Sequence, residues 1–320
     1  MPNLRQNIIT GEWVIIAPER EKRPEDFICS EKIVAKDLKE CPFCPNGEAK
    51  KTEIFSTSNI YVIPNKFPSF VSEDAVLEQG GELYPSFKAL GYHEVIILKD
   101  HNIDLKDLPK ATIDELLYVF QERMKIHLKD PAIEYSMVIY NHGPDSGATI
   151  EHPHAQIFAS SILPPYVEKE LNGAKRYFNK NKKCVFCELE KSEKEKGERV
   201  IFENEKFLAF CFFAARFPFE IWIMPKNHEN YFEKIDKSER IQLAEILSLV
   251  FKVLYKKLND PAYNFFIHTA PPEVYGGEQF FHWHLEITPR LSKYGGYELG
   301  SGIMVDVVSP EKAAMFLREN

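Results

Sequence analysis

The sequence lacks any long hydrophobic run, and none approaches the roughly 18 residues that a membrane-spanning helix needs. An apolar stretch near the N-terminus, residues 13–18, is too short for the core of a signal peptide, and no small-residue cleavage site follows it. We therefore expect a cytoplasmic protein with no membrane partner.

A basic surplus is also missing. The 320 residues carry 40 Lys and Arg against 48 Asp and Glu, which gives a net charge of −8. General nucleic-acid binders usually carry excess positive charge, so no nucleic-acid partner is expected. A small phosphorylated ligand stays compatible, since a pocket can be positive within an acidic protein. With 44% hydrophobic residues, the chain can bury the cores of two domains.

Cysteine is scarce, with six residues in the chain. Four of them form two Cys-x-x-Cys pairs, Cys41/Cys44 and Cys184/Cys187. In a reducing compartment a repeated pair of this kind indicates metal binding before disulfides. Neither pair lies in a thioredoxin-like βαβ setting, so redox chemistry is a weaker interpretation than metal binding. Unmetallated thiols in buried turns are also a weaker interpretation.

Other features recur in the same order in both halves of the chain. Each half has a strand-like run, an amphipathic helix, a second strand and a closing His-x-His, which is His152-Pro-His154 in the first half and His282-Trp-His284 in the second. Such a repeat predicts a duplicated module of the α+β class, with largely antiparallel sheets and packed helices.

The two predicted domains are residues 1–178, with the first metal site, and residues 179–320, with the second. The break between them is placed in the charged tract Asn179–Lys196, which we expect to be a solvated surface loop.

The repeat selects metal ligands among the histidines, because His101 has a counterpart in His228 and His152 has one in His282. Zn²⁺ prefers four thiolate or imidazole ligands in a tetrahedron. We expect two structural zinc ions per chain, with four protein ligands each and no open position for water. The predicted ligands are Cys41, Cys44, His101 and His152 for one ion, and Cys184, Cys187, His228 and His282 for the other.

The chemistry is predicted at His154. Residues i and i+2 of a strand point to the same face, so His154 and Gln156 follow His152 on one side. The preceding segment, residues 141–149, contains glycines and short polar residues that can turn backbone N–H groups toward an anion. A neutral imidazole beside a phosphate site is a competent nucleophile at phosphorus.

These motifs give the chain a resemblance to the galactose-1-phosphate uridylyltransferase family of the histidine-triad superfamily. The likeness covers nearly the whole chain and is carried by residues 10–24, by Cys41-Pro-Phe-Cys44 and by residues 141–156 with their His-Pro-His-x-Gln.

The resemblance implies a ping-pong nucleotidyl transfer, with His154 as nucleophile on the α-phosphate of a nucleotide sugar and Gln156 holding a phosphate oxygen. It also implies a homodimer, and substrates that are a nucleotide sugar and a sugar 1-phosphate or phosphate. The family's phosphate, leaving-group and ribose contacts fall on Arg20, Arg23, Asn65, Asn141, Gly147 and Thr149.

Two departures from the uridylyltransferase pattern leave alternatives open. Well-known bacterial members build their second metal site from a Glu and three histidines. The corresponding residues here would be Glu170, His268, His282 and His284. We prefer the cysteine site, because thiolates outcompete a carboxylate for Zn²⁺. The C-terminal stretch lacks the family's hexose-phosphate Gln, with Met304 near that position, and resembles the plant-type ADP-glucose phosphorylase branch.

In this C-terminal stretch the expected substrate contacts are Lys293, Tyr297 and a glycine-rich run, Gly300, Ser301 and Gly302, that would cradle a free phosphate acceptor. The first hypothesis is therefore a UDP-glucose:hexose-1-phosphate uridylyltransferase, and the second an ADP-glucose phosphorylase. A third hypothesis is a zinc-stabilised nucleotide-binding protein without turnover.

The second half carries its own copy of the motif, in which His284 is followed by Glu286. We predict that this second copy is not catalytic, since a carboxylate at the position that corresponds to Gln156 would repel phosphate.

Overall fold

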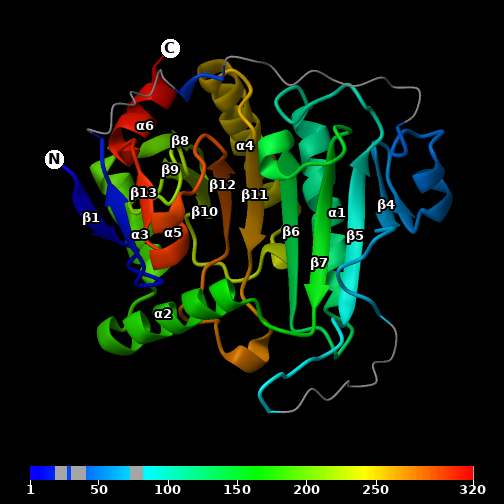
Figure 1. Cartoon of the computed structure of the whole chain (residues 1–320), viewed down its shortest axis with the longest axis horizontal. Helices are drawn as coiled ribbons and strands as arrows, with labels where there is room; N and C mark the ends of the chain where they lie inside the picture. The colour runs from blue at the N-terminus through cyan, green and yellow to red at the C-terminus, as the bar shows by residue number, and fades with distance from the viewer. Residues whose placement is uncertain (19–26, 30–40, 73–81, 320) are drawn as a thin grey trace.

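The computed structural model describes residues 1–18, 27–29, 41–72 and 82–319. Its centre is a ten-stranded sheet with the strand order β3-β4-β5-β7-β6-β11-β12-β10-β9-β8 (Figure 1). The strands of this sheet are β3 (Phe55–Ser56), β4 (Ile60–Pro64), β5 (Gly91–Leu98), β6 (Tyr135–His142), β7 (His154–Ser160), β8 (Val200–Glu203), β9 (Phe207–Cys211), β10 (Ile221–Pro225), β11 (Tyr263–His268) and β12 (His284–Pro289). All pairs of neighbouring strands are antiparallel.

The strand order has an internal twofold symmetry. Strands β3, β4, β5, β7 and β6 of the first half correspond, from the edge inward, to β8, β9, β10, β12 and β11 of the second half. The halves meet where β6 pairs with β11, with Tyr140 opposite Phe265 and Asn141 opposite Asn264. The predicted α+β class, with duplicated modules and largely antiparallel sheets, is confirmed.

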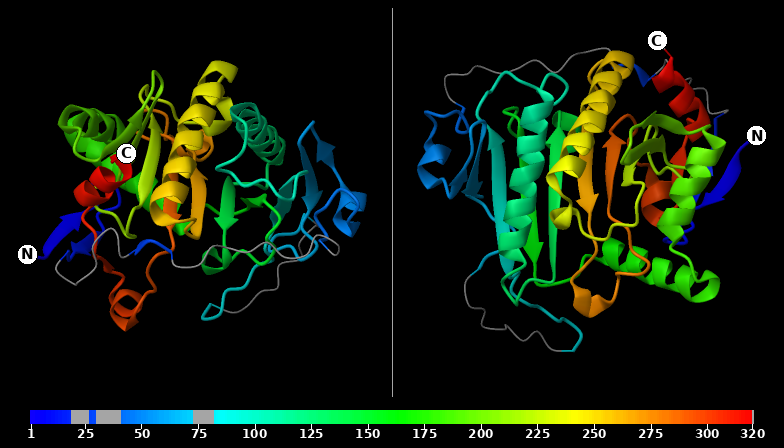
Figure 2. Two further views of the ribbon diagram at one scale, coloured as in Figure 1. Left: turned by 90° about the horizontal axis from the view of Figure 1, so that it is seen from above. Right: turned by 180° about the vertical axis from the view of Figure 1, so that it is seen from behind.

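Helices α1 (Lys110–His127) and α4 (Lys237–Leu258) are the corresponding helices of the two halves, and they lie side by side on one face of the sheet (Figure 2). Both bury the apolar positions that recur every fourth residue, such as Leu116 and Phe120 in α1. The shared core under both helices joins the two halves, so that neither has a separate hydrophobic core on this face.

The opposite face and the sheet edge carry the elements that the repeat does not contain. These are β1 (Asn3–Gln6), β2 (Trp13–Ile16), α2 (Pro165–Asn181), α3 (Val185–Lys196), α5 (Gly296–Ser301), β13 (Met304–Asp306) and α6 (Pro310–Arg318). Strands β1, β2 and β13 form a second sheet, so both ends of the chain lie at the same side of the molecule (Figure 1). An ion pair between Arg5 and Glu311, at 2.9 Å, also joins these ends.

The charged tract that was expected to be a loop is mostly helical. Helix α2 continues to Asn181, and α3 occupies Val185–Lys196. Phe186 and Glu193 of α3 are buried, and Glu193 pairs with Arg199 at 2.9 Å. The loop prediction was wrong because a charged run can still place one apolar face and one ion-paired carboxylate against the core. The division between residues 178 and 179 falls inside α2 and stays a prediction.

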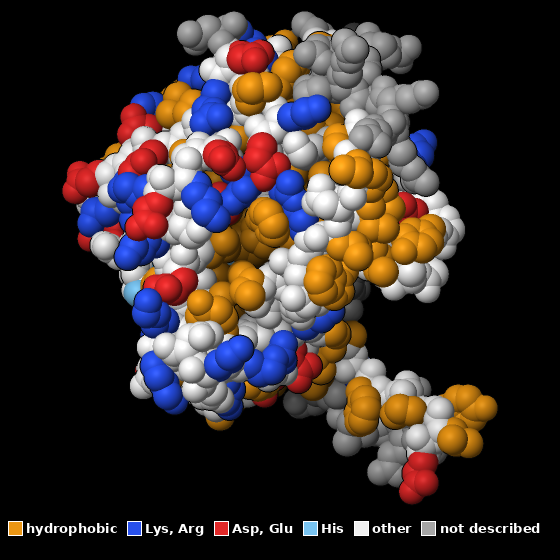
Figure 3. All heavy atoms as spheres, turned by 90° about the vertical axis from the view of Figure 1, so that its left-hand side faces the viewer, with side chains coloured by type: hydrophobic (Ala, Val, Ile, Leu, Met, Phe, Trp, Pro, Cys, Tyr) orange, Lys and Arg blue, Asp and Glu red, His pale blue; other side chains and the backbone are white. Residues whose placement is uncertain are grey.

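The surface carries charges of both signs, as Figure 3 shows for the side near β1. Among the described residues, no helix is long and apolar enough to cross a membrane. An extension with exposed apolar side chains projects from the molecule (Figure 3). Leu83, Tyr84 and Phe87 are 73–84% exposed.

Candidate nucleotidyl-transfer site and metal-ligand clusters

Strand β7 separates the core from the candidate site. Its side chains Ala155 and Ile157 belong to the core beneath α1 and α4. Because side chains alternate along a strand, His154 and Gln156 face the other side of the sheet. The structure therefore places the predicted nucleophile and its partner on one face, as the sequence interpretation required.

The imidazole of His154 is held in one tautomer. Its Nδ1 lies 2.7 Å from the carbonyl oxygen of His152. A carbonyl only accepts hydrogen bonds, so Nδ1 carries the proton and Nε2 keeps its lone pair. Burial lowers the pKa of His154, which keeps the ring neutral at pH 7. The ring of Phe43, from the first Cys-x-x-Cys turn, packs edge-on against it at 5.1 Å between centroids.

The segment before β7 forms a compact turn. Gly143 and Gly147 have φ values of 78° and 87°, in the left-handed region that favours glycine. Asn264 of β11 donates to Asn141 Oδ1 at 2.7 Å and to the carbonyl oxygen of Ser146 at 2.8 Å. The second half of the chain thus supports the predicted phosphate loop of the first half.

A cavity of about 280 Å³ lies beside this turn. Asn141, Thr149 and His152 contribute to its lining. Gly147 is not among its lining residues, but it sets the course of the same turn. A phosphorylated group entering this cavity would meet the end of β6 and the start of β7.

The first predicted metal-ligand set is assembled. Cys41, Cys44, His101 and His152 place one ligand atom each within 4.8 Å of one another. Sulfur to Nδ1 distances are 3.4–3.8 Å, and the two Nδ1 atoms are 3.0 Å apart. Ligands of a tetrahedral zinc, with bonds of about 2.0–2.3 Å, are separated by roughly 3.3–3.8 Å. The sulfur–nitrogen distances lie in this range and the Nδ1–Nδ1 distance is about 0.3 Å shorter, so a small outward shift of one imidazole accommodates Zn²⁺.

The orientation of His152 also fits this role. Its Nε2 lies 2.5 Å from the carbonyl oxygen of Leu98, so it donates there and leaves Nδ1 free to bind a metal. Burial lowers the pKa of His152 to about 4, which keeps the ring neutral. One residue thus presents a ligand atom to the metal cluster and a carbonyl oxygen to His154.

The second predicted set is assembled as well, from Cys184, Cys187, His228 and His282. Cys187 Sγ lies 3.2 Å from His228 Nδ1 and 3.8 Å from His282 Nδ1. Hydrogen bonds from the Cys187 thiol and from the two imidazoles lower the pKa of Cys184, and the same contact with Cys184 raises the pKa of Cys187. The pair therefore shares one proton, which Zn²⁺ would displace on binding both sulfurs.

A third group of buried donors lies next to it, consisting of Glu170, His268, His284 and Glu286. It contains three residues of the alternative metal site, but Glu286 takes the place that His282 would have filled. The two alternatives are therefore separate clusters in this chain. Arg216 pairs with Glu286 and, at 3.1 Å, with Glu220, which places a fixed positive charge against the third group.

The second-half counterpart of His154 has a different electrostatic setting. Although burial lowers it, the carboxylates of Glu170 and Glu286 raise the pKa of His284 to about 10. The ring is therefore protonated at neutral pH and has no lone pair for attack at phosphorus. This difference supports the prediction that the second copy is not catalytic.

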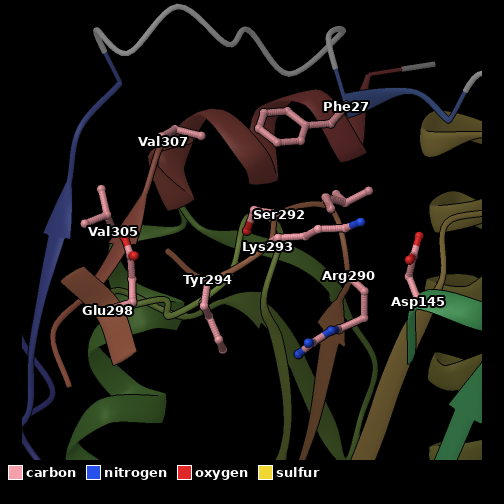
Figure 4. Close-up of a pocket in the computed structure, with 10 residues that line it drawn as sticks. Phe27, Asp145, Arg290, Ser292, Lys293, Tyr294, Glu298, Val305 and Val307 are labelled. Carbon is pink, nitrogen blue, oxygen red and sulfur yellow. The ribbon is translucent and has the colours of Figure 1, made fainter. Parts of the chain in front are cut away.

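Of the predicted acceptor residues, Lys293 lines a larger cavity of about 640 Å³ (Figure 4). Lys293 extends into it from one side and Asp145 lies on the other (Figure 4). Tyr297 lines a separate, smaller cavity of about 290 Å³.

The glycine-rich run does not form the expected open cradle. Residues 300–302 are the last turn of α5 and the residue that follows it. Gly302 N–H donates to Glu298 O at 2.9 Å, and Ile303 N–H donates to Ser301 Oγ at 3.1 Å. Carbonyl groups face outward at a helix C-terminus, which disfavours an anion there. Substrate contacts of Gly300, Ser301 and Gly302 stay predictions, without a cradle of free N–H groups.

Two predicted phosphate contacts, Arg20 and Arg23, lie outside the described residues. Asn65 follows β4, and its Nδ2 lies 3.0 Å from His93 Nε2. Sequence reasoning missed His93, Asn264 and Phe43, which contact Gln156, Asn141 and His154 respectively. Phe43 could have been found from its place inside the first Cys-x-x-Cys, whereas no sequence signal marks the other two.

Two models of one family match this chain in succession. The N-terminal domain of galactose-1-phosphate uridyl transferase matches residues 1–164, and the C-terminal domain matches residues 170–317. An ADP-glucose phosphorylase of Arabidopsis thaliana is 34% identical over 330 residues, covering 99% of this chain and 93% of the relative. A galactose-1-phosphate uridylyltransferase of Thermotoga maritima is 30% identical over 331 residues, covering 100% and 98%.

Solved structures show the same relationship. The crystal structure of the A. thaliana ADP-glucose phosphorylase with bound ADP-glucose superposes with a TM-score of 0.85 at 34% identity, covering 100% of this chain and 99% of that chain. A uridylyltransferase structure superposes with a TM-score of 0.79 at 27% identity, covering 99% and 98%.

The duplicated sheet, with a buried His-x-His at the start of a central strand, defines an enzyme of the nucleotidyltransferase class in these comparisons. The chain belongs to the galactose-1-phosphate uridyl transferase family.

Proposed function

We propose that this enzyme transfers a nucleotidyl group from a nucleotide sugar through a covalent intermediate on His154. The observation that carries the proposal is the 2.7 Å contact between His154 Nδ1 and the carbonyl oxygen of His152. It leaves the Nε2 lone pair as the attacking group, on the face of the sheet that α1 and α4 do not cover. Gln156, on the same face, is placed to hold a phosphate oxygen.

In the first step, the Nε2 lone pair attacks the α-phosphorus. The bond from phosphorus to the bridging oxygen breaks, and the sugar 1-phosphate leaves with that electron pair. The proton on Nδ1 stays in place, and the carbonyl of His152 stabilises the positive ring. In the second step, an oxygen of the acceptor phosphate attacks phosphorus and the N–P bond breaks, which restores neutral His154.

Zinc is proposed as a structural component at the two cysteine clusters, two ions per chain. Four protein ligands at each cluster leave no position for an activated water, so the ions would fix the turns that carry Phe43 and the backbone of His152. The donor distances given above support this assignment.

A UDP-glucose:hexose-1-phosphate uridylyltransferase is the first candidate activity. It is supported by the His-Pro-His motif and by the 30% identity to the T. maritima galactose-1-phosphate uridylyltransferase. An ADP-glucose phosphorylase is the second candidate. It is favoured by the 34% identity to the A. thaliana ADP-glucose phosphorylase over nearly the full length of both chains.

One experiment separates the candidates. The enzyme is incubated with UDP-glucose and with ADP-glucose, each labelled at the α-phosphate, and label on the protein is measured. The isolated intermediate is then offered galactose 1-phosphate, glucose 1-phosphate and inorganic phosphate in turn. Labelling by UDP-glucose with discharge to galactose 1-phosphate supports the first candidate, and labelling by ADP-glucose with discharge to phosphate supports the second. A protein that takes up no label from either donor would contradict the covalent mechanism.

A homodimer is proposed from the family resemblance. Exposed apolar side chains at Leu83, Tyr84 and Phe87 support it, because monomeric proteins rarely expose several large apolar groups on one short segment. Light scattering should give about twice the 37.1 kDa of one chain. A monomeric mass throughout the micromolar range would contradict the dimer.

A further inference from the structure

His93, which the interpretation above leaves without a role, is a buried histidine next to the proposed catalytic pair. It lies on β5, where it is opposite Phe158 of β7, and it is 7% exposed. Its ring stacks on Phe158 with 3.9 Å between centroids. A histidine used only for packing would need no polar neighbours, but both of its ring nitrogens have them.

The neighbours of His93 determine where its proton is. Nδ1 lies 3.1 Å from the backbone nitrogen of Ser69, whose N–H can only donate, so Nδ1 has no proton. The neutral ring therefore carries its proton on Nε2. Nε2 lies 2.8 Å from Gln156 Oε1 and donates to it. Burial lowers the pKa of His93, which agrees with a neutral ring.

This bond orients the Gln156 amide. When Oε1 accepts from His93, the NH₂ group of Gln156 has to point the other way, as a donor. A phosphate oxygen needs a donor and would be repelled by Oε1, so only one of the two amide orientations serves the proposed reaction. The amide nitrogen of Asn65 lies 3.0 Å from His93 Nε2. Because both groups are donors when Nε2 is protonated, they make no hydrogen bond with each other, and the Asn65 NH₂ stays available for another acceptor.

We propose that His93 is a positioning residue for nucleotidyl transfer, which fixes the Gln156 amide with its NH₂ group toward the reacting phosphate. The proposal rests on the function proposed for His154 and Gln156. His93 would not touch the substrate, so its effect should pass through Gln156 alone.

The test uses the full-length enzyme and single-turnover labelling by whichever α-labelled nucleotide sugar labels the wild type. His93→Phe keeps a flat ring against Phe158 and removes the donor to Gln156, together with the acceptor of the Ser69 N–H. We expect about tenfold to hundredfold slower labelling, because removing one donor to a developing phosphate charge typically costs about a hundredfold or more and misorientation costs part of that. The KM for the donor should change less than about threefold, since the ring makes no substrate contact.

A double-mutant comparison tests whether His93 acts through Gln156. In a Gln156→Ala background, adding His93→Phe should change the rate less than about twofold. His93→Gln places an amide NH₂ near the position of Nε2 and should recover a rate within about threefold of the wild type, which also covers the case that His93→Phe fails to fold. Tyr92→Phe, on the same strand but bonded to Asp130, is the matched control and should label normally.

The outcomes separate the two ideas. Normal labelling by a folded His93→Phe protein, independent losses in the double mutant, or a His93→Gln protein as slow as His93→Phe would each overturn the role of His93. No label on the wild type would instead overturn the proposed function, and with it the reaction that this role serves.

Discussion

The first metal-ligand cluster should matter for catalysis, and the second should matter for stability alone. Cys41→Ser removes a sulfur ligand from the cluster that contains His152, whose carbonyl oxygen accepts a hydrogen bond from His154 Nδ1–H. Cys184→Ser disturbs the corresponding cluster beside His284, whose ring is protonated. The two variants change the same atom type in equivalent turns, so each is a control for the other.

The size of the effect follows from the hydrogen bond at His154. If the backbone of His152 shifts, the Nδ1 proton loses a buried acceptor, which costs about 1–3 kcal/mol. At 1.4 kcal/mol for each factor of ten, the transfer rate should fall about tenfold to hundredfold. Cys184→Ser should leave the rate per folded molecule within about threefold while it lowers the melting temperature.

The assay combines three measurements on freshly purified, unchelated protein. Elemental analysis should give about two zinc ions per chain for the wild type and about one for either variant. Single-turnover labelling gives the transfer rate, and circular dichroism gives the folded fraction. Equal losses of rate in the two variants at equal folded fraction would refute the coupling through His152, and one or no metal in the wild type would refute the two-site assignment.

Three further predictions concern single side chains. His154→Ala should abolish turnover but leave the affinity for the nucleotide within about tenfold of the wild type. The covalent adduct of the wild type should be acid-labile and base-stable, and an acid-stable adduct would contradict a bond to nitrogen. Asn264→Ala should slow transfer about tenfold without loss of metal, because it removes both hydrogen bonds that tie the glycine-rich turn to β11. A rate equal to the wild type would show that the hydrogen bonds within the turn suffice to hold it. Glu94→Gln should lower the free energy of unfolding by about 3–5 kcal/mol in urea titrations, because it leaves the buried Arg123 without its bidentate partner, whereas the exposed Glu48→Gln should have no measurable effect. Burial raises the pKa of Glu94, but hydrogen bonds from an imidazole and Arg123 outweigh it and lower that pKa below 4.5. The stability that Glu94 contributes should therefore be present above about pH 4.5 and be lost as the pH falls through the folded-state pKa. A stability difference between wild type and Glu94→Gln that does not shrink as the pH is lowered below about 4.5 would contradict the assignment.

The repeat in the sequence was enough to predict the fold class. Equivalent strands, helices and His-x-His motifs in one order imply two copies of one module, and the symmetric strand order confirms it. The repeat also selected, among the ten histidines, the four that lie with the two cysteine pairs. The spacing within each motif indicates the ligands, because a Cys-x-x-Cys turn presents two sulfurs to one metal and residues i and i+2 of a strand point to the same face.

Sequence reasoning failed where a local pattern has more than one structural outcome. The charged tract 179–196 became helix, since its few apolar residues found a core to pack on. The run 300–302 became the end of a helix, since glycine permits a left-handed C-cap as readily as an open anion loop. Both outcomes depend on what lies next to the segment in space.

The sequence by itself determined the duplicated module, the ligand types and the His154–Gln156 pair on one face. The module follows from motifs that recur in the same order in both halves, and the other two follow from periods of two to four residues. Only the tertiary structure decided which donors meet. It placed His93 of β5 against Gln156 of β7, and it brought Asn264 from the second half to Asn141 in the first. It also separated the cysteine cluster from the buried carboxylates around His284. Such pairings depend on strand register across the sheet, which no local period specifies.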